Sequence, residues 1–348
     1  MIDLRSDVCA PPTEEMWEAM RSAPLGWAPA RGDPSVARLE SVAADMLGQE
    51  AAVWTPTCGM ANLAALLSLV PRDGTVVLEA AAHILTSEGM GIVHLGGIIP
   101  RPVEGRDGRL EVETVEAAFA EDGAALLCLE NTHTRSGGCV VGVEETSRLV
   151  AAARRHGARV HLDGARLANA AVALGAPLTE LSGGADTVAL SLNKGLCAPL
   201  GAVLAGGRRS IEDARVVLHR LGGASVHKAG IAAAAGLIAL EQMVDRLAED
   251  HRRARELALH LSELPGVRVT PEPVETNILF VDAAEAGWRP GELATQLAAR
   301  GVLVDGRDEG RTRLVTHRGI GDGDVERSIE AFAAVIARAQ PEPQSCEG

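Results

Sequence analysis

The sequence contains no tyrosine, three phenylalanines and, among 33 basic residues, two lysines, Lys194 and Lys228. All other cationic positions are arginines, whose guanidinium stays protonated and is a poor nucleophile. A lysine amine, in contrast, can lose its proton and attack a carbonyl carbon. Lys194 lies where an apolar run meets a glycine-rich loop ("TVALSLNKG"), so it is the candidate for such chemistry. Lys228 has no comparable context and is interpreted as a surface residue.

Long apolar runs and basic tracts are also missing. No apolar stretch is long enough to span a bilayer, and a net charge of −14 disfavours nucleic acid or an anionic membrane as a partner. The first residues, "MIDLRSDVCA", carry charges where a signal peptide needs an apolar core. The six cysteines form no CxxC pair and no spacing typical of zinc, so no metal site is expected. We therefore expect a cytoplasmic protein with reduced thiols.

Short apolar runs alternate with helix-length segments through the middle of the chain. We expect strands within residues 51–57, 74–80, 124–133, 158–166 and 186–195. This alternation is typical of βαβ units and predicts an α/β fold with a mostly parallel sheet. In such sheets, ligands bind in the loops beyond the carboxyl ends of the strands.

The pattern changes towards the C-terminus. A long alanine-rich helix is expected over 229–264, followed by short strands around one helix and by a closing helix. The sequence therefore predicts a large domain over 1–245, in which the first residues, to about residue 12, form an N-terminal arm, and a smaller α+β domain over 246–340. The tail, 341–348, has little to bury and is expected to be disordered.

Three features of the predicted sheet edge suit one cofactor. Asp163 ends an apolar strand, Lys194 follows the next strand, and the turn "TPTCGMAN" opens a helix whose free N–H groups suit a phosphate. Asp163 alone is more typical of a helix N-cap, and both roles stay open at this point. Together, the three features are the arrangement that pyridoxal 5′-phosphate requires. The sequence contains no P-loop, GxGxxG, HExxH or GxSxG motif, which disfavours the commonest nucleotide-binding and hydrolase alternatives.

Seven stretches then match one family in chain order. They are "DLRSD" (3–7), "GDPSVARLE" (32–40), "MAN" (60–62), "LENTH" (129–133), "HLDGARLANA" (161–170), "LNKGLCAPLGAVLAG" (192–206) and "RLVTH" (313–317). The sequence resembles the low-specificity L-threonine aldolases, which are fold-type I pyridoxal phosphate enzymes of the beta-eliminating lyase/threonine aldolase group. The resemblance runs from residue 3 to about residue 335. It implies the two-domain fold of these enzymes and pyridoxal 5′-phosphate as the cofactor.

The resemblance assigns the central roles of the site. Lys194 matches the Schiff-base lysine, and Asp163 matches the partner of the pyridine nitrogen. His83 matches the histidine that stacks on the cofactor ring near the substrate hydroxyl. His133 matches a second active-site histidine, for which a purely structural role at a strand end is an equal alternative to proton transfer.

The remaining matched residues contact the substrate or the phosphate. Ser6, Arg166 and Arg313 match the groups that hold the substrate carboxylate, and Arg166 is also placed beside the cofactor. The resemblance assigns no metal ligand in this sequence.

The phosphate site departs from the family pattern. Cys58 and Gly59 stand in the phosphate turn, where Cys58 replaces a small glycine. Arg220 and His227 precede the long helix, and His227 replaces an arginine that in relatives helps to hold phosphate across a subunit interface. The resemblance therefore implies a homodimer as the minimal active unit, paired into a tetramer as in relatives.

The expected reaction is retro-aldol cleavage of L-threonine, L-allo-threonine or a related β-hydroxy-α-amino acid into glycine and an aldehyde. The alternatives are another pyridoxal phosphate reaction on the same scaffold (β-elimination, racemisation or transamination), a cofactor-binding protein without catalysis, and a binding module without a cofactor.

Overall fold

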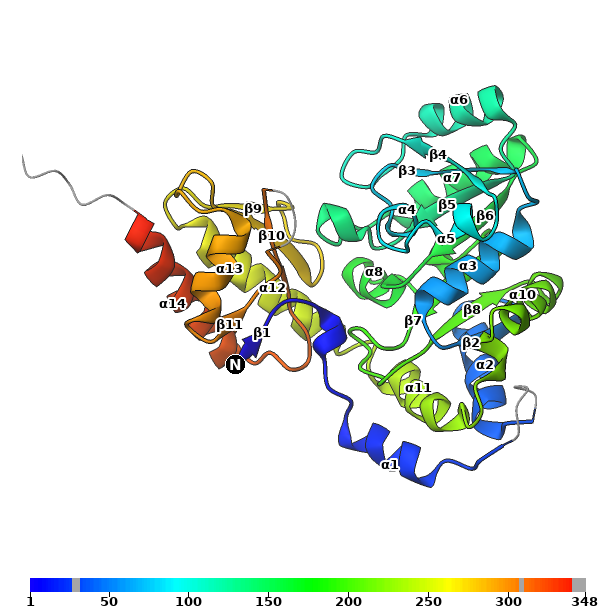
Figure 1. Cartoon of the computed structure of the whole chain (residues 1–348), viewed down its shortest axis with the longest axis horizontal. Coiled ribbons are helices and arrows are strands. Elements are labelled where there is room, and N and C mark those ends of the chain that lie inside the picture. Colours follow the sequence, from blue (N-terminus) through cyan, green and yellow to red (C-terminus); the bar gives the residue numbers. More distant parts are fainter. Residues whose placement is uncertain (27–31, 307–309, 340–348) are drawn as a thin grey trace, which may run out of the picture. The chain divides into compact units, whose positions relative to one another are not determined.

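The computed structural model describes residues 1–26, 32–306 and 310–339. The chain forms two compact units (Figure 1), one over Pro11–Arg246 and the other combining Met1–Ala10 with Leu247–Gly348. The predicted disorder of the tail, 341–348, concerns residues outside the described ranges.

The larger unit is built on a seven-stranded sheet of the described residues, in the order β2-β8-β7-β6-β5-β3-β4. The strands are β2 (Ala51–Thr55), β3 (Thr75–Glu79), β4 (Ile99–Val103), β5 (Leu126–Glu130), β6 (Arg159–Asp163), β7 (Thr187–Ser191) and β8 (Ala202–Gly206). The run from β7 to β4 is parallel, and β8 is antiparallel to both of its neighbours. The prediction of an α/β fold with a mostly parallel sheet is confirmed.

Helices and short helical turns connect these strands. They are α1 (Glu14–Ser22), α2 (Pro34–Met46), α3 (Cys58–Leu69), α4 (His83–Thr86), α5 (Gly91–His94), α6 (Val112–Asp122), η2 (Thr134–Ser136), α7 (Val143–Arg155), α8 (Leu167–Leu174), α9 (Leu178–Leu181), α10 (Arg208–Arg220), η3 (Gly223–Ser225) and α11 (Gly230–Gln242). Every residue of β5, β7 and β8 is buried, so both faces of these strands are covered, as in parallel α/β sheets. Apolar side chains of α3 and α10 pack on β2, β7 and β8.

The second unit joins the N-terminal residues to the C-terminal part of the chain. Its elements are β1 (Ile2–Asp3), η1 (Asp7–Cys9), α12 (Leu247–Ser262), β9 (Arg268–Thr270), β10 (Ile278–Asp282), α13 (Pro290–Ala298), β11 (Val302–Leu303), β12 (Thr312–Val315), α14 (Asp322–Ile336) and η4 (Ala337–Ala339). β10 pairs antiparallel with β9 and β12, and β1 pairs parallel with β11. Ile2 and Leu4 belong to the apolar core of this unit. The first residues, expected as an arm of the large domain, are therefore part of the second unit instead.

The long helix predicted over 229–264 is two helices. α11 ends at Gln242 and α12 begins at Leu247, with a turn between them. Neither proline nor glycine stands in this turn. The helices belong to different compact units, so tertiary packing interrupts a segment whose composition favours a continuous helix.

Candidate active site

Three neighbouring parallel strands of the sheet end in a carboxylate. β3 ends at Glu79, β5 at Glu130 and β6 at Asp163, and all three side chains are buried. Glu130 and Asp163 are register partners on adjacent strands. Because the carboxyl ends of parallel strands meet at one edge of a sheet, this edge carries a row of acidic groups. Lys194 follows β7, the next strand along, so the predicted Asp163 and Lys194 share the edge.

Asp163 is held by neutral hydrogen-bond donors. Its Oδ2 accepts a bond from Asn62 Nδ2 (2.9 Å), and its Oδ1 accepts one from the Ala165 N–H (3.1 Å). The following helix, α8, has Arg166 at its N-cap and no side-chain capping bond. Asp163 therefore does not cap α8, the alternative that its sequence position left open.

A buried hydrogen-bonded chain orients Asn62. The Asn62 carbonyl Oδ1 lies 3.1 Å from His161 Nε2, and His161 Nδ1 lies 2.8 Å from Thr187 Oγ1. An amide oxygen accepts but does not donate, so Nε2 carries the proton and Nδ1 accepts from the threonine hydroxyl. Burial lowers the pKa of His161 to about 4, although the charge of Asp163 opposes this, so the imidazole is neutral. The Asn62 amide N–H groups then face carboxylates, Asp163 and Glu88 (2.9 Å).

The first turn of α3 has the features expected of a phosphate site. Thr57 is its N-cap and accepts a hydrogen bond from the Met60 N–H (3.1 Å). Cys58 and Gly59 are its first residues, and backbone N–H groups at such positions have no partner within the helix. Burial, together with the charge of Asp163, raises the pKa of the Cys58 thiol, which stays protonated. A neutral thiol at this position leaves the positive end of the helix available to an anion.

Lys194 lies in the loop that follows β7 and is partly exposed. Its amine makes no hydrogen bond or ion pair within the described part of the chain. The positive charge of Lys194 lowers the pKa values of Cys58, His83 and Glu88. It opposes the effect of burial at Cys58 and Glu88 and adds to it at His83. These three groups therefore lie within electrostatic range of Lys194. The predicted amine therefore acts electrostatically on the phosphate turn, through Cys58, and on the predicted ring-stacking histidine.

His83 opens α4 and lines an open cavity of about 560 Å³ together with Gly59 and Glu88. Its backbone N–H donates to Glu130 Oε2 (2.7 Å), whereas its ring nitrogens have no hydrogen-bond partner among the residues that the structure describes. Burial lowers the pKa of His83, with Lys194 acting in the same direction and Asp163 opposing. At neutral pH the imidazole is therefore uncharged and able to accept a proton.

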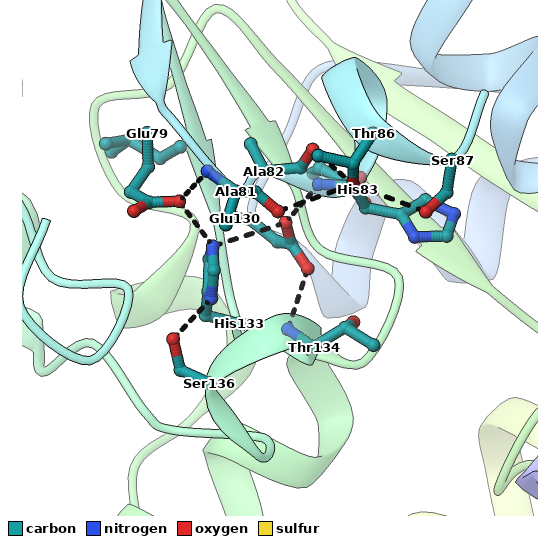
Figure 2. A network of polar contacts seen from close by, with 12 residues as sticks. Glu79, Ala81, Ala82, His83, Thr86, Ser87, Glu130, His133, Thr134 and Ser136 are labelled. Atoms are coloured by element: carbon teal, nitrogen blue, oxygen red, sulfur yellow. Dashed lines mark hydrogen bonds and ion pairs between the residues drawn. The ribbon is translucent and has the colours of Figure 1, made fainter. Parts of the chain in front are cut away.

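His133 occupies a different environment from His83. Its side chain is buried, with Nδ1 2.9 Å from Ser136 Oγ and Nε2 3.0 Å from Glu79 Oε2 (Figure 2). The contact with Glu79 is an ion pair. Glu130 Oε2 lies 3.8 Å from Nε2 and also holds the backbone of His83. His133 is buried and both of its ring nitrogens face protein side chains, so the geometry favours its structural alternative.

The two glutamates control the protonation of His133. Burial by itself lowers the pKa of His133, but the bond to Glu79 and the charges of Glu130 and Glu79 outweigh burial and hold the pKa above its usual value. Burial raises the pKa of Glu79, but the bond and charge of His133 outweigh this and lower it. Sequence reasoning identified neither glutamate, although both end an apolar strand as Asp163 does.

The predicted carboxylate-binding residues are divided between the two units. Arg166 is buried in the larger unit, where its Nη1 donates to Thr134 Oγ1 (3.2 Å). In the other unit, Arg313 on β12 donates from Nη2 to Asp305 Oδ2 (2.9 Å) and to the Arg5 carbonyl oxygen (3.2 Å). Ser6 caps η1, and its Oγ accepts from the Val8 N–H (3.4 Å). Arg313 thus contacts the backbone immediately before Ser6.

The predicted second source of phosphate ligands lies beside α3. Arg220 ends α10 and His227 follows η3, and both are exposed in the single chain. Between them, Gly223 is so close to Met60 of α3 that an added Cβ would lie 2.3 Å from the methionine sulfur. The segment that carries Arg220 and His227 is therefore packed against the first turn of α3.

The described residues contain no cluster of three or more His, Cys, Asp or Glu side chains that could hold a metal ion. None of their helices has the length and apolar character needed to cross a membrane.

The donor set fits pyridoxal 5′-phosphate. Asp163 offers a carboxylate whose own donors are neutral, the N-terminus of α3 suits a phosphate, and Lys194 offers an amine on the same edge.

Comparisons with known proteins agree with this assignment. Residues 3–286 match the family described as beta-eliminating lyase. The chain is 37% identical to "Low-specificity L-threonine aldolase 1" of Arabidopsis thaliana, covering 97% of both chains, and 30% identical to "Alanine racemase TOXG" of Cochliobolus carbonum, covering 97% of this chain and 88% of the other. Threonine aldolase of Leishmania major superposes with a TM-score of 0.82 at 18% identity, covering 97% of this chain and 100% of that structure. The fold is accordingly that of the fold-type I pyridoxal phosphate enzymes.

Proposed function

This chain belongs to the beta-eliminating lyase family and is a pyridoxal-phosphate-dependent lyase, and we propose that it cleaves L-threonine, L-allo-threonine or a related β-hydroxy-α-amino acid into glycine and an aldehyde. The observation that carries the proposal is the sheet edge that Asp163 and Lys194 share, with His83, a residue of the cavity, within electrostatic range of both. The 37% identity to a low-specificity L-threonine aldolase over nearly the whole chain supports the substrate class.

The cofactor, when bound, accepts the electron pair released at the substrate Cα. Three parts of this chain would hold it: the Lys194 amine, the Asp163 carboxylate as partner of the ring nitrogen, and the backbone N–H groups of Cys58 and Gly59 at the phosphate. Asn62 keeps the Asp163 carboxylate in place, since it donates to Oδ2 while its own carbonyl is fixed by His161. A preorganised carboxylate of this kind favours a protonated ring nitrogen without reorganisation during the reaction.

His83 is the group that we assign to the β-hydroxyl of the substrate. Its imidazole is neutral, lines the cavity and has ring nitrogens without partners in the described residues, so it meets the requirements of a general base. Ser6, Arg166 and Arg313 are proposed to hold the substrate carboxylate. Guanidinium groups suit this role because they bind carboxylates with two parallel hydrogen bonds.

A second candidate is racemisation of a small amino acid. The 30% identity to a protein named alanine racemase favours it over the other reactions that this cofactor supports. Both reactions leave an electron pair at Cα and differ in which bond to Cα breaks, so the same residues serve either.

A substrate panel decides between them. The purified protein, supplied with pyridoxal 5′-phosphate, is incubated with L-threonine, L-allo-threonine, L-serine and L-alanine. Release of glycine with an aldehyde supports the aldolase, pyruvate with ammonia indicates β-elimination, and D-alanine indicates racemisation. Absence of glycine from every β-hydroxy-α-amino acid tested would refute the proposal.

The proposed assembly is a homodimer, paired into a tetramer, and the proposed compartment is the cytoplasm. The first is supported by the exposure of Arg220 and His227 in the single chain, since residues that bind phosphate need an enclosed site. The second is supported by free thiols at the five cysteines that the structure describes. Sedimentation of a fully active monomer would refute the assembly.

A further inference from the structure

Glu88 is an acidic residue of the cavity to which the proposed reaction has so far given no role. It follows α4, and its side chain lines the same cavity as His83. Its Oε1 accepts a hydrogen bond from Asn62 Nδ2 (2.9 Å), and its Oε2 has no hydrogen-bond partner within the described part of the chain. The carboxyl lies against Gly59, where a Cβ would be 3.4 Å from Glu88 Cδ. Glu88 therefore lies against the phosphate turn and lines the same cavity as His83, with one oxygen fixed and one available.

The hydrogen-bonded chain determines what Glu88 contacts. His161 donates to the Asn62 carbonyl, which forces the amide N–H groups of Asn62 towards acceptors. Asn62 Nδ2 lies 2.9 Å from Asp163 Oδ2 and 2.9 Å from Glu88 Oε1, so one amide bridges two carboxyl groups. Two carboxylates that share a site resist ionising together, because like charges repel.

The charged and titratable groups around Glu88 come from several elements. They are Asp163 at the end of β6, Glu130 at the end of β5, Lys194 after β7, Cys58 on α3 and Cys128 on β5. Burial, together with the charge of Asp163, raises the pKa of Glu88 to about 7, although Asn62 and Lys194 oppose this. Near neutral pH, Glu88 is thus divided between its acid and its carboxylate forms.

Near neutral pH, His83 and Glu88 differ from a typical histidine and a typical glutamate in which of them accepts and which donates a proton. A histidine commonly donates and a glutamate commonly accepts a proton near neutral pH, but here burial lowers the pKa of His83 and raises that of Glu88. The imidazole is the available acceptor, and the carboxyl is the available donor. A reaction that removes a proton from one substrate atom and adds a proton to another needs one group that accepts and one that donates.

We propose that Glu88 exchanges a proton with the substrate Cα and acts as a pair with His83 in the proposed reaction, on which this inference rests. His83 accepts the β-hydroxyl proton, the Cα–Cβ bond breaks, and the O–H electron pair becomes the second bond of the aldehyde C=O. The electron pair of the broken bond stays with Cα until Glu88 supplies a proton, which forms the new C–H bond of glycine. A proton then returns from His83 to Glu88 through cavity water, so that both groups regain their starting forms.

The test is exchange of the glycine α-proton in D₂O, which requires proton transfer at Cα but no Cα–Cβ cleavage. In the holoenzyme, Glu88→Gln should slow this exchange by about 100-fold, because a positioned acid or base contributes roughly 10²–10⁴ to a rate. Glu88→Asp should restore part of the rate and shift its pH midpoint. Glu104→Gln, an exposed residue with the same change of charge, should leave exchange unchanged.

An infrared measurement reports on Glu88 without turnover. The wild-type holoenzyme should show a protonated carboxyl band that disappears as pH rises through neutrality, and this band should be missing from Glu88→Gln. Wild-type exchange in Glu88→Gln, or the same carboxyl bands in both proteins, would overturn the inference. If Glu88→Gln does not fold, an unshifted pH midpoint in Glu88→Asp overturns it as well. Failure of the proposed function would give a different result from failure of this inference. The wild type would then release no glycine from threonine, although its glycine exchange would still depend on Glu88.

Discussion

Replacing Glu79 by glutamine removes one charge from a buried ion pair while keeping the shape of the side chain. Glu79 Oε2 lies 3.0 Å from His133 Nε2, and both side chains are at least nine-tenths buried. The variant leaves His133 without its nearest counter-charge. It therefore measures what the glutamate contributes to holding a protonated imidazole inside the protein.

The expected loss follows from the remaining contacts. Removing one partner of a buried ion pair costs about 3–5 kcal/mol when the other charge is left uncompensated. Here the glutamine keeps a polar oxygen beside the imidazole, and Glu130 remains 3.8 Å from it. We therefore expect the free energy of unfolding to fall by about 2 kcal/mol, the scale of one hydrogen bond to a charged group.

The contributions of His133 and Glu79 to the free energy of unfolding depend on pH in opposite directions. His133 has a raised pKa in the folded state, so its contribution is fully present below its unfolded value of 6.5 and is lost as pH rises through the folded pKa. Glu79 has a lowered pKa, so its contribution is present above its unfolded value of 4.5 and is lost as pH falls through the folded pKa. The difference between wild type and variant should be largest between these two unfolded values.

Urea unfolding of wild type, Glu79→Gln, His133→Asn and the double variant at pH 5.5 and 8.5 tests this reasoning. The single changes should each destabilise the protein more at pH 5.5, and the double-variant cycle should show a favourable coupling. The exposed residue Glu104 supplies the control, Glu104→Gln, which should unfold as wild type does. Equal losses at both pH values, or no coupling, would refute the ion pair. A His133→Asn protein of normal stability that has lost turnover would instead assign His133 to proton transfer.

Three further predictions concern the cofactor. Borohydride should fix pyridoxal phosphate to Lys194 and bleach the visible absorption, and neither Lys194→Ala nor Lys194→Arg should turn over substrate; a label on Lys228 would contradict this. Asp163→Asn should retain the cofactor but react at least tenfold more slowly, since about 1.4 kcal/mol of lost charge pairing is tenfold in rate; near-normal turnover would remove the assigned role. If His227 binds phosphate, His227→Arg should retain the cofactor longer than the wild type on dialysis, because a guanidinium binds phosphate with two hydrogen bonds; equal loss from both proteins would contradict the role.

Much of the fold was predictable because its local signals agree with its tertiary structure. The apolar runs that become β5, β6 and β7 are short, bounded by polar residues and separated by helix-length segments, so they predict buried parallel strands. The break between α11 and α12 was not predictable in this way. Its sequence contains no helix breaker, and its position is set by packing in two separate units.

The site was predictable only where one residue carries the signal. Lys194 is conspicuous because lysine is otherwise almost missing, and Asp163 because it ends an apolar strand. Glu79 and Glu130 also end apolar strands, but no neighbouring sequence feature suggests a partner for them. Glu88 has no such signal, because its environment depends on Asn62, which also donates to Asp163, 101 positions away in the sequence.

The row of strand-end carboxylates explains why Asp163 is the one assigned to the cofactor. Three buried acids on one edge repel one another, so each needs compensation. Glu79 is paired with the His133 imidazole, whose protonated form it favours, and accepts one backbone N–H bond; Glu130 accepts two backbone N–H bonds and also lies near this imidazole. Asp163 is compensated by an amide and one backbone N–H, both neutral, which orient its carboxylate without cancelling its charge. Of the three, Asp163 is therefore the carboxylate that would gain most from an external cation, such as the protonated pyridine ring of the proposed cofactor.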